Sequence, residues 1–264
     1  TTLGHNITAL EVDGTFDECQ ALVKQAFLDE KLHSHIRLSS ANSINIARLI
    51  PQMLYYFRAW QQIEDRNRPL AVCIPSGNFG NLTAGLMAKR LGLPLAHFIA
   101  ATNVNDVVPD YLAHGQFHAR PSTPTLSNAM DVGNPSNFAR MLDLYGGSWE
   151  NMTTDIAGFA FSDAETEAEI QRVFQTYGYV LDPHGAVGQL ALEAFLTLHP
   201  SYQGIVLETA HPAKFPEAVE AATGQAVAIP ERLARLKDET KVATFMAPDY
   251  EEFQVWLREK AAIS

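Results

Sequence analysis

The chain has 264 residues, of which 47% are hydrophobic, so it can bury a sizeable core as one large α/β domain or two smaller ones. Its formal charge of -11 and its isoelectric point near 5.2 argue against nucleic acid or an anionic membrane as a partner. No apolar run approaches the length of a membrane span and the first residues lack the features of a signal peptide, so we expect a globular cytoplasmic protein.

The first part of the chain alternates strand-like and helix-like patterns. Residues 6 to 12 alternate apolar and polar side chains as a strand does, and Asp17 can cap the helix that follows. A short strand is expected at residues 36 to 38. An amphipathic helix is expected at residues 50 to 60, with Pro51 in its first turns, where a missing N–H group is tolerated.

Buried strands dominate the next part of the chain. Residues 71 to 75 and 95 to 101 are apolar and predict two strands with a helix between them, which indicates a parallel sheet covered by helices on both faces. Residues 106 to 160 are rich in Pro and Gly and predict loops and short helices. Ser162 and Glu165 form a capping-box pattern at a helix start. The remaining predictions are helices at residues 162 to 177, 184 to 198 and 248 to 262 and a strand at residues 204 to 207.

Three polar stretches lie at or near predicted strand ends, namely residues 39 to 48, 76 to 81 and 208 to 214. Ligands of open α/β sheets bind outside the carboxyl ends of the strands. The stretches offer hydroxyls, amides, backbone N–H groups and a few cations, but no paired acids and no thiol. This chemistry favours binding of phosphate and a polar small molecule over a metal site or a nucleophilic serine. We therefore expect no metal.

The middle stretch reads as a strand, a tight loop and a helix. Gly77 and Gly80 are expected to allow positive φ and close approach of a ligand. Asn78 and Asn81 are expected to cap a helix that begins at Leu82. Unpaired N–H groups at such a helix start favour an anion. On these residues alone, a simple strand-to-helix connection fits equally well.

The other two stretches have simpler alternatives too. Asn42, Ser43 and Arg48 lie within seven residues at a helix start, so two neutral donors and a guanidinium could converge on an oxyanion. The alternative is an N-cap beside a solvent-exposed arginine. Lys214 is interpreted as a solvated lysine and His211 as a structural histidine.

Together these stretches resemble the threonine synthase family, whose members are pyridoxal-phosphate enzymes of the tryptophan-synthase-β-like fold (fold type II). The resemblance covers nearly the whole chain. It rests on Asp-Glu-Cys-Gln-Ala-Leu-Val-Lys (residues 17 to 24), Ser-Ala-Asn-Ser-Ile-Asn-Ile-Ala-Arg-Leu (40 to 49), Pro-Ser-Gly-Asn-Phe-Gly-Asn (75 to 81), Ala-Ala-Thr-Asn-Val-Asn-Asp (100 to 106), Thr-Leu-Ser-Asn-Ala-Met-Asp-Val (125 to 132) and Thr-Ala-His-Pro-Ala-Lys-Phe (209 to 215).

The resemblance implies a three-layer αβα fold with a mostly parallel sheet, and a cofactor, pyridoxal 5'-phosphate. Thr209 would meet the pyridine nitrogen of the cofactor as a neutral partner. Asn42, Ser43 and Arg48 would hold the phosphate of the substrate. The implied ligands of the cofactor phosphate, acting mainly through their backbone, are Gly77, Asn78, Phe79, Gly80 and Asn81.

The resemblance also implies an activity, a carbon-oxygen lyase reaction in threonine biosynthesis. The family converts O-phospho-L-homoserine and water to L-threonine and phosphate. We expect this small molecule as substrate, and a monomer or homodimer. Two alternatives stay open, a non-catalytic phosphate-binding or substrate-binding protein of the same fold and another fold type II lyase such as threonine dehydratase.

One departure from the family pattern limits this expectation. Family members carry a Schiff-base lysine in a Ser/Ala-Phe-Lys-Asp context and a Ser-Gly-Asp-Thr-Gly loop, and neither occurs in these 264 residues. We therefore expect a carboxy-terminal portion that lacks the N-terminal part of the fold, contains no catalytic lysine and is inactive alone. Residues 1 to 40 would be a remnant of the family's smaller domain, and residues 41 to 264 the larger, cofactor-binding domain.

Overall fold

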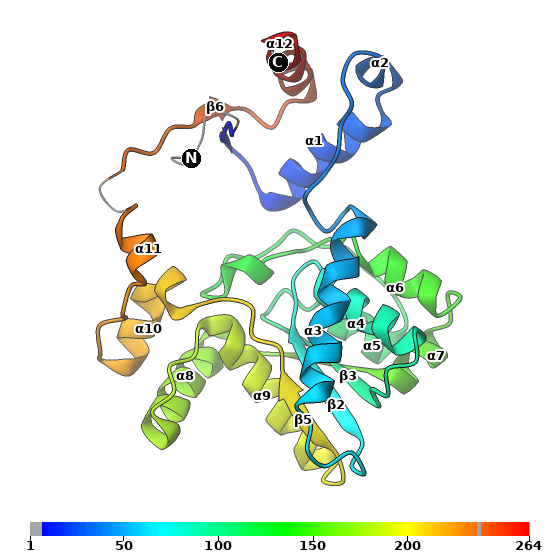
Figure 1. The fold of residues 1–264 in the computed structure, drawn as a ribbon, viewed down its shortest axis with the longest axis vertical. Coiled ribbons are helices and arrows are strands. Elements are labelled where there is room, and N and C mark those ends of the chain that lie inside the picture. The colour runs from blue at the N-terminus through cyan, green and yellow to red at the C-terminus, as the bar shows by residue number, and fades with distance from the viewer. Residues whose placement is uncertain (1–6, 237–238, 264) are drawn as a thin grey trace. The chain divides into compact units, whose positions relative to one another are not determined.

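The structure, a computed structural model, describes residues 7 to 236 and 239 to 263 (Figure 1). Its internal contacts divide the chain into two compact units. One unit combines Thr1–Ser40 with Ile229–Ser264, and the other is Ala41–Ala228. The C-terminal residues therefore group with the N-terminal ones, whereas we predicted them as part of the larger domain. Among the described residues, no helix has the length and apolar character needed to cross a bilayer.

The smaller unit is built on a pair of short parallel strands, β1 (Leu10–Val12) and β6 (Thr244–Met246), which explains why the two ends of the chain group together. Helix α1 begins with a capping box that we did not predict. Its N-cap residue is Thr15, whereas we expected Asp17 to cap this helix. The prediction of a strand at residues 36 to 38 is wrong, because those residues pair with no described strand. Of the strand predicted at residues 6 to 12, residue 6 lies outside the described part. The helices of the unit are α1 (Phe16–Leu28), α2 (Glu30–His33), α11 (Glu231–Ala234) and α12 (Tyr250–Ile263).

The larger unit contains a four-stranded sheet in the order β4-β3-β2-β5, and all neighbouring strands are parallel. The predicted parallel sheet is confirmed. The prediction of only loops and short helices over residues 106 to 160 missed one strand, β4, in which Ala and Gly at three of five positions leave no strand-like apolar pattern. A Cβ atom at Gly158 would lie 2.7 Å from the Cα atom of Pro109, so this strand cannot carry a large residue there. The strands are β2 (Leu70–Pro75), β3 (His97–Thr102), β4 (Ile156–Ala160) and β5 (Gln203–Val206).

Helices cover both faces of this sheet, which confirms the αβα architecture (Figure 1). Successive side chains of a strand point to opposite faces. Val72 and Ile74 accordingly join the core under α3 and α4, whereas Ala71 and Cys73 join the core under α9. Both faces of β2 are therefore buried. The helices of this unit are α3 (Leu49–Gln61), α4 (Gly80–Arg90), α5 (Val107–His114), α6 (Phe138–Leu144), α7 (Trp149–Asp155), α8 (Asp163–Tyr177), α9 (Pro183–Leu198) and α10 (Pro216–Thr223), with 3-10 turns η1 (Ile46–Arg48), η2 (Asn128–Met130) and η3 (Pro212–Lys214).

Candidate functional site

A cavity of about 280 Å³ lies where β2 and β5 end. These strands are parallel neighbours, so the segments that follow them leave the sheet at the same edge. The cavity volume is at the lower end of the usual range for small-molecule sites. The lining residues are Ser43, Gln52, Tyr55, Pro75, Ser76, Gly77, Asn78, Phe79, Gly80, Asn81 and Thr209. All six residues predicted to contact the cofactor thus lie around one cavity, together with Ser43.

The loop between β2 and α4 differs in detail from the prediction. Helix α4 begins at Gly80 rather than Leu82, and neither asparagine caps it with its side chain. The left-handed residue is Phe79, with φ 57° and ψ 18°, and neither Gly77 nor Gly80 has positive φ. The first-turn N–H groups of α4 consequently lack both intrahelical partners and a side-chain cap. An anion in the cavity could accept hydrogen bonds from them.

The two glycines are required for close packing, not for an unusual backbone conformation. A Cβ atom at Gly77 would lie 2.7 Å from the Cα atom of Met130, which is backbone and cannot move aside cheaply. A Cβ atom at Gly80 would lie 2.9 Å from the Cβ atom of Ser43. The loop is therefore pressed against the segment that carries Met130 on one side and against the segment that carries Ser43 on the other.

The side chain of Asn78 holds the loop in place through three hydrogen bonds. Its Oδ1 accepts from the backbone N–H and the hydroxyl of Ser136, at 2.6 and 2.9 Å. Its Nδ2 donates to the Ser43 hydroxyl at 2.9 Å. In addition, the backbone carbonyl of Asn78 accepts from Asn137 Nδ2 at 2.9 Å. Because the side chain bonds to the protein, a ligand of this loop would meet mainly backbone N–H groups.

Arg140 links this loop to the segment before α3. Its guanidinium donates to the Ser43 carbonyl at 3.0 Å, to Asn137 Oδ1 at 2.6 Å and to the Ile44 carbonyl. Sequence reasoning missed Ser136, Asn137 and Arg140. The Asn-Pro-Ser-Asn run at residues 134 to 137 indicates a turn, but nothing in the sequence places it beside residue 78.

Helix α3 holds the far end of the loop. The Tyr56 hydroxyl donates to the Asn81 carbonyl at 2.7 Å and lies 3.1 Å from Asn81 Oδ1. Burial raises the pKa of Tyr56, so the phenol stays protonated and keeps this donor role. Gln52 and Tyr55 of the same helix line the cavity and were not predicted. Gln52 lies four residues before Tyr56, so helical spacing could have suggested it once Tyr56 was known to face the loop, but that spacing does not indicate Tyr55.

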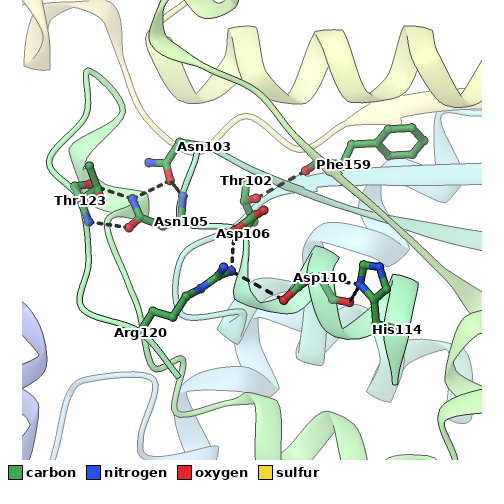
Figure 2. Close-up of polar contacts among 9 residues, drawn as sticks. All are labelled: Thr102, Asn103, Asn105, Asp106, Asp110, His114, Arg120, Thr123 and Phe159. Atoms are coloured by element: carbon green, nitrogen blue, oxygen red, sulfur yellow. Dashed lines mark hydrogen bonds and ion pairs between the residues drawn. The ribbon is translucent and has the colours of Figure 1, made fainter. Parts of the chain in front are cut away.

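A buried polar network holds the wall behind Gly77. Figure 2 shows Asn105 and Thr123 paired through two hydrogen bonds, with Thr123 N–H donating to Asn105 Oδ1 at 2.7 Å and Asn105 Nδ2 donating to the Thr123 carbonyl at 2.9 Å. Asn103 Oδ1 accepts from the N–H and the Nδ2 of Asn105, each at 2.9 Å, and the Arg120 guanidinium bonds to Asp106 Oδ1 at 2.6 Å. Asn103 Nδ2 also donates to Thr125 Oγ1 at 2.8 Å and to Asp131 Oδ1 at 2.9 Å. The motifs at residues 100 to 106 and 125 to 132 therefore form one scaffold, which carries Met130.

Of the three residues predicted to hold the substrate phosphate, one lines the cavity and two do not. Ser43 lines the cavity, whereas Asn42 and Arg48 are exposed and do not line it. Asn42 Oδ1 accepts from the Ser43 hydroxyl at 3.1 Å, and the Arg48 guanidinium donates to the Ala41 carbonyl. In the third stretch, His211 Nδ1 accepts from the Ala213 N–H at 3.0 Å, which agrees with a structural role.

The lining chemistry fits a phosphorylated small molecule. All described residues that line the cavity are uncharged, so an anion would be held by N–H groups, hydroxyls and amides. Thr209 adds a neutral side chain with a hydroxyl to the lining, which can both donate and accept a hydrogen bond. Among the described residues, no group of three His, Cys, Asp or Glu side chains could hold a metal ion.

The fold is that of a class of cofactor-dependent enzymes. Residues 2 to 207 match the family model described as pyridoxal-phosphate dependent enzyme, and the chain belongs to this family. Residues 185 to 255 match the model described as threonine synthase, C-terminal. The chain is 50% identical over 240 residues to threonine synthase of Escherichia coli (90% of this chain, 55% of the relative) and 45% identical over 258 residues to that of Haemophilus influenzae (97% and 60%).

Solved structures agree with this assignment. The crystal structure of threonine synthase from Escherichia coli has a TM-score of 0.91 and 43% identity, and it covers 98% of this chain and 60% of that one. The pyridoxal-phosphate-bound threonine synthase from Brucella melitensis has a TM-score of 0.84 and 33% identity, with 99% and 61% covered. The chain thus spans about 60% of the length of the relatives it matches.

Proposed function

We propose that this chain provides the cofactor-phosphate site of a threonine synthase, which converts O-phospho-L-homoserine and water to L-threonine and phosphate. The observation that carries the proposal is the single cavity that combines residues 76 to 81, Thr209 and Ser43. The family model and the named relatives support it. Because the relatives are threonine synthases, they favour this reaction over that of threonine dehydratase.

Each part of the cavity has a distinct task in this proposal. When bound, pyridoxal phosphate supplies a ring that delocalises negative charge from the substrate. Residues 77 to 81 would bind the cofactor phosphate through the start of α4, and Asn78, held by Ser136, keeps that loop in shape. The Thr209 hydroxyl would hydrogen bond to the ring nitrogen and orient the ring.

Binding of the substrate phosphate requires a change around Ser43. We propose Asn42, Ser43 and Arg48 as its ligands, and Ser43 already lines the cavity. The Arg48 guanidinium would have to exchange the Ala41 carbonyl for the phosphate. That exchange is favourable in principle, because guanidinium and phosphate carry opposite charges and can pair through two parallel hydrogen bonds, whereas the carbonyl is a neutral acceptor.

We propose that the chain alone binds the cofactor without turnover. Among the described residues lining the cavity none is a lysine, so no amine is placed to hold the cofactor covalently or to move a proton. Both cysteines are unpaired, which fits a cytoplasmic location. We expect a monomer or homodimer.

Titration of the purified chain with pyridoxal phosphate, followed by absorbance and calorimetry, tests this proposal. We expect saturable binding that excess inorganic phosphate competes away, and no phosphate release from O-phospho-L-homoserine. Thr209→Val should weaken binding about fivefold, the equivalent of one hydrogen bond. Thr197→Val, the same change at an exposed position of α9, should leave it unchanged. Equal affinity of both variants would contradict the role of Thr209, and turnover by the chain would contradict the proposed lack of catalysis.

One alternative function shares the same cavity. A non-catalytic phosphate-binding or substrate-binding protein is favoured by the uncharged, lysine-free lining. Such a protein should bind O-phospho-L-homoserine or inorganic phosphate at least as tightly as pyridoxal phosphate. Comparison of the three ligands in one calorimetric series separates the two functions.

A further inference from the structure

The larger unit contains a second cavity, of about 560 Å³, whose polar groups have no task in the proposed function. It is lined by the segments that follow β5 and α10 and by the connection between α8 and α9. It shares no lining residue with the candidate cofactor cavity. Its volume lies within the usual range for small-molecule sites, so we ask which ligand its lining suits.

The acidic group of this cavity is the part-buried carboxyl of Glu208. Its Oε2 accepts a hydrogen bond from the hydroxyl of Tyr179, another lining residue, at 2.9 Å. Glu208 forms no ion pair with any described residue. Burial raises the pKa of Glu208, because the charged form has lost water without gaining a cation. A positively charged ligand group would therefore stabilise the carboxylate.

The same cavity is lined by neutral donors. His211 Nδ1 accepts from the Ala213 N–H at 3.0 Å, so a neutral imidazole carries its hydrogen on Nε2. No described residue accepts a hydrogen bond from that Nε2. The backbone N–H groups of Ala226 and Ala228 likewise have no acceptor among the described residues. These donors suit an anionic group of the ligand.

Hydrogen bonds hold the wall formed by residues 225 to 228 against α10. The Val227 N–H donates to Glu220 Oε1 at 2.9 Å. The Gln225 N–H donates to the Thr223 hydroxyl at 3.3 Å, and that hydroxyl donates to the Val219 carbonyl at 2.7 Å. The loop after α10 is thus fixed by several bonds, which favours a preformed cavity over a transient one.

The rest of the lining is small and largely apolar, with Val180, Pro212 and Val227 among its members. No described Lys or Arg lines the cavity. A phosphate or a second carboxylate on the ligand would bring additional negative charge beside Glu208 without a cation to balance it. The lining therefore favours a ligand with one cationic group, one anionic group and a small uncharged remainder.

We propose that this cavity binds a free α-amino acid with a small apolar side chain. Its ammonium group would pair with the Glu208 carboxylate, and its carboxylate would accept from the Nε2–H of His211 and from backbone N–H groups of residues 226 to 228. Its side chain would contact the apolar lining. The inference does not rest on the proposed function, because the two cavities are lined by different residues.

Calorimetric titration of the purified chain with L-valine tests the site. We expect saturable binding that excess inorganic phosphate does not compete away. Glu208→Gln keeps an acceptor for the Tyr179 hydroxyl but removes the charge, and it should weaken binding about tenfold. Glu217→Gln, the same change at an exposed position of α10, should leave the affinity unchanged.

Two analogues of L-valine assign its charged groups to their partners. 3-Methylbutanoate, which lacks the ammonium group, should bind the wild type about tenfold more weakly than L-valine does. It should lose no further affinity in Glu208→Gln, because both changes remove the same ion pair. His211→Asp keeps an N-cap acceptor for the Ala213 N–H and removes the Nε2 donor. At about pH 7 it should weaken L-valine but not L-valinamide, which is still cationic there and lacks the carboxylate.

Several outcomes would overturn the proposal. These are the absence of saturable L-valine binding, equal effects of Glu208→Gln and Glu217→Gln, competition by inorganic phosphate, and an affinity for L-aspartate equal to that for L-valine. If Glu208→Gln does not fold, the comparison of L-valine with 3-methylbutanoate on the wild type still decides whether the ammonium group is recognised. The titration with pyridoxal phosphate reports separately on the proposed function, since it concerns the other cavity.

Discussion

At the level of single residues, the side chain of Asn78 joins the cavity loop to two segments that are distant in the chain. One small amide accepts two hydrogen bonds from Ser136 and donates one to Ser43, across separations of 58 and 35 residues in the chain. The hydrogen bond from the Ser136 N–H to the amide oxygen is part-buried. Loss of the amide would therefore leave unsatisfied donors as well as a loosened loop.

We expect Asn78→Ala to lower the free energy of unfolding by about 2 to 3 kcal/mol, the cost of unsatisfied part-buried donors together with lost hydrogen bonds. Urea unfolding followed by circular dichroism measures it. Asn67→Ala, the same change at an exposed position, should stay within about 0.5 kcal/mol of the wild type. Equal effects of both changes would show that Asn78 does not hold the loop.

At the level of elements, the contact between α3 and α4 fixes the far end of the loop at residues 76 to 81, where α4 begins. Gly85 in the middle of α4 lies directly beneath the ring of Tyr56, and a Cβ atom there would be 2.5 Å from two ring atoms. The same tyrosine bonds to the first turn of α4 through its hydroxyl. Close approach of the two helices thus lets one side chain both pack against α4 and position its N-terminus.

Gly85→Ala should destabilise the protein although alanine is the better helix former. The gain in helix propensity is about 1 kcal/mol, whereas overpacking costs about 1 to 3 kcal/mol, and 2.5 Å is shorter than any real contact of a Cβ atom. The difference is a net loss of up to about 2 kcal/mol, which urea unfolding measures.

A double-mutant cycle identifies the cause of that loss. Combined with Tyr56→Leu, which removes the ring, Gly85→Ala should cost at least about 0.5 kcal/mol less than it does alone. Combined with Tyr56→Phe, which keeps the ring and removes the hydroxyl, its cost should be unchanged. The same cost in both backgrounds would mean that the ring is not what limits the helix contact.

At the level of the larger unit, one half-buried histidine links stability to pH. His97 opens β3 and stacks on Phe195 of α9 at 5.0 Å. Burial lowers the pKa of His97 to about 4. His97 therefore binds a proton near pH 6.5 in the unfolded chain but only near pH 4 in the folded chain. Folding stability must fall as the pH falls through this window.

We expect the urea midpoint of the wild type to decrease between about pH 7 and about pH 4.5, with a shallower decrease in His97→Gln. The exposed His118→Gln should retain the wild-type slope. Chemical denaturation at a series of pH values provides the comparison. Parallel slopes for all three proteins would show that His97 titrates normally in the folded state.

Prediction from the sequence succeeded where the signal is local. The apolar runs of β2 and β3, the capping box at Ser162 and the helix after Pro183 are confirmed, because propensity, capping and hydrophobic period act within a few residues. β4 was missed because three of its five residues are Ala or Gly, and the positive φ was assigned to the glycines although Phe79 adopts it. Packing against neighbouring segments overrides local preference at both places.

The sequence by itself determined the αβα class, the loop at residues 76 to 81 as a phosphate site candidate, and the resemblance to threonine synthases, since each depends on composition and order along the chain. Only the tertiary structure decided which distant segments surround that loop. The parallel pairing of β2 with β5 brings Thr209 to it, and Arg140 brings Ser43. Such contacts join residues far apart in sequence, so they depend on the register and packing of whole elements and leave no local pattern.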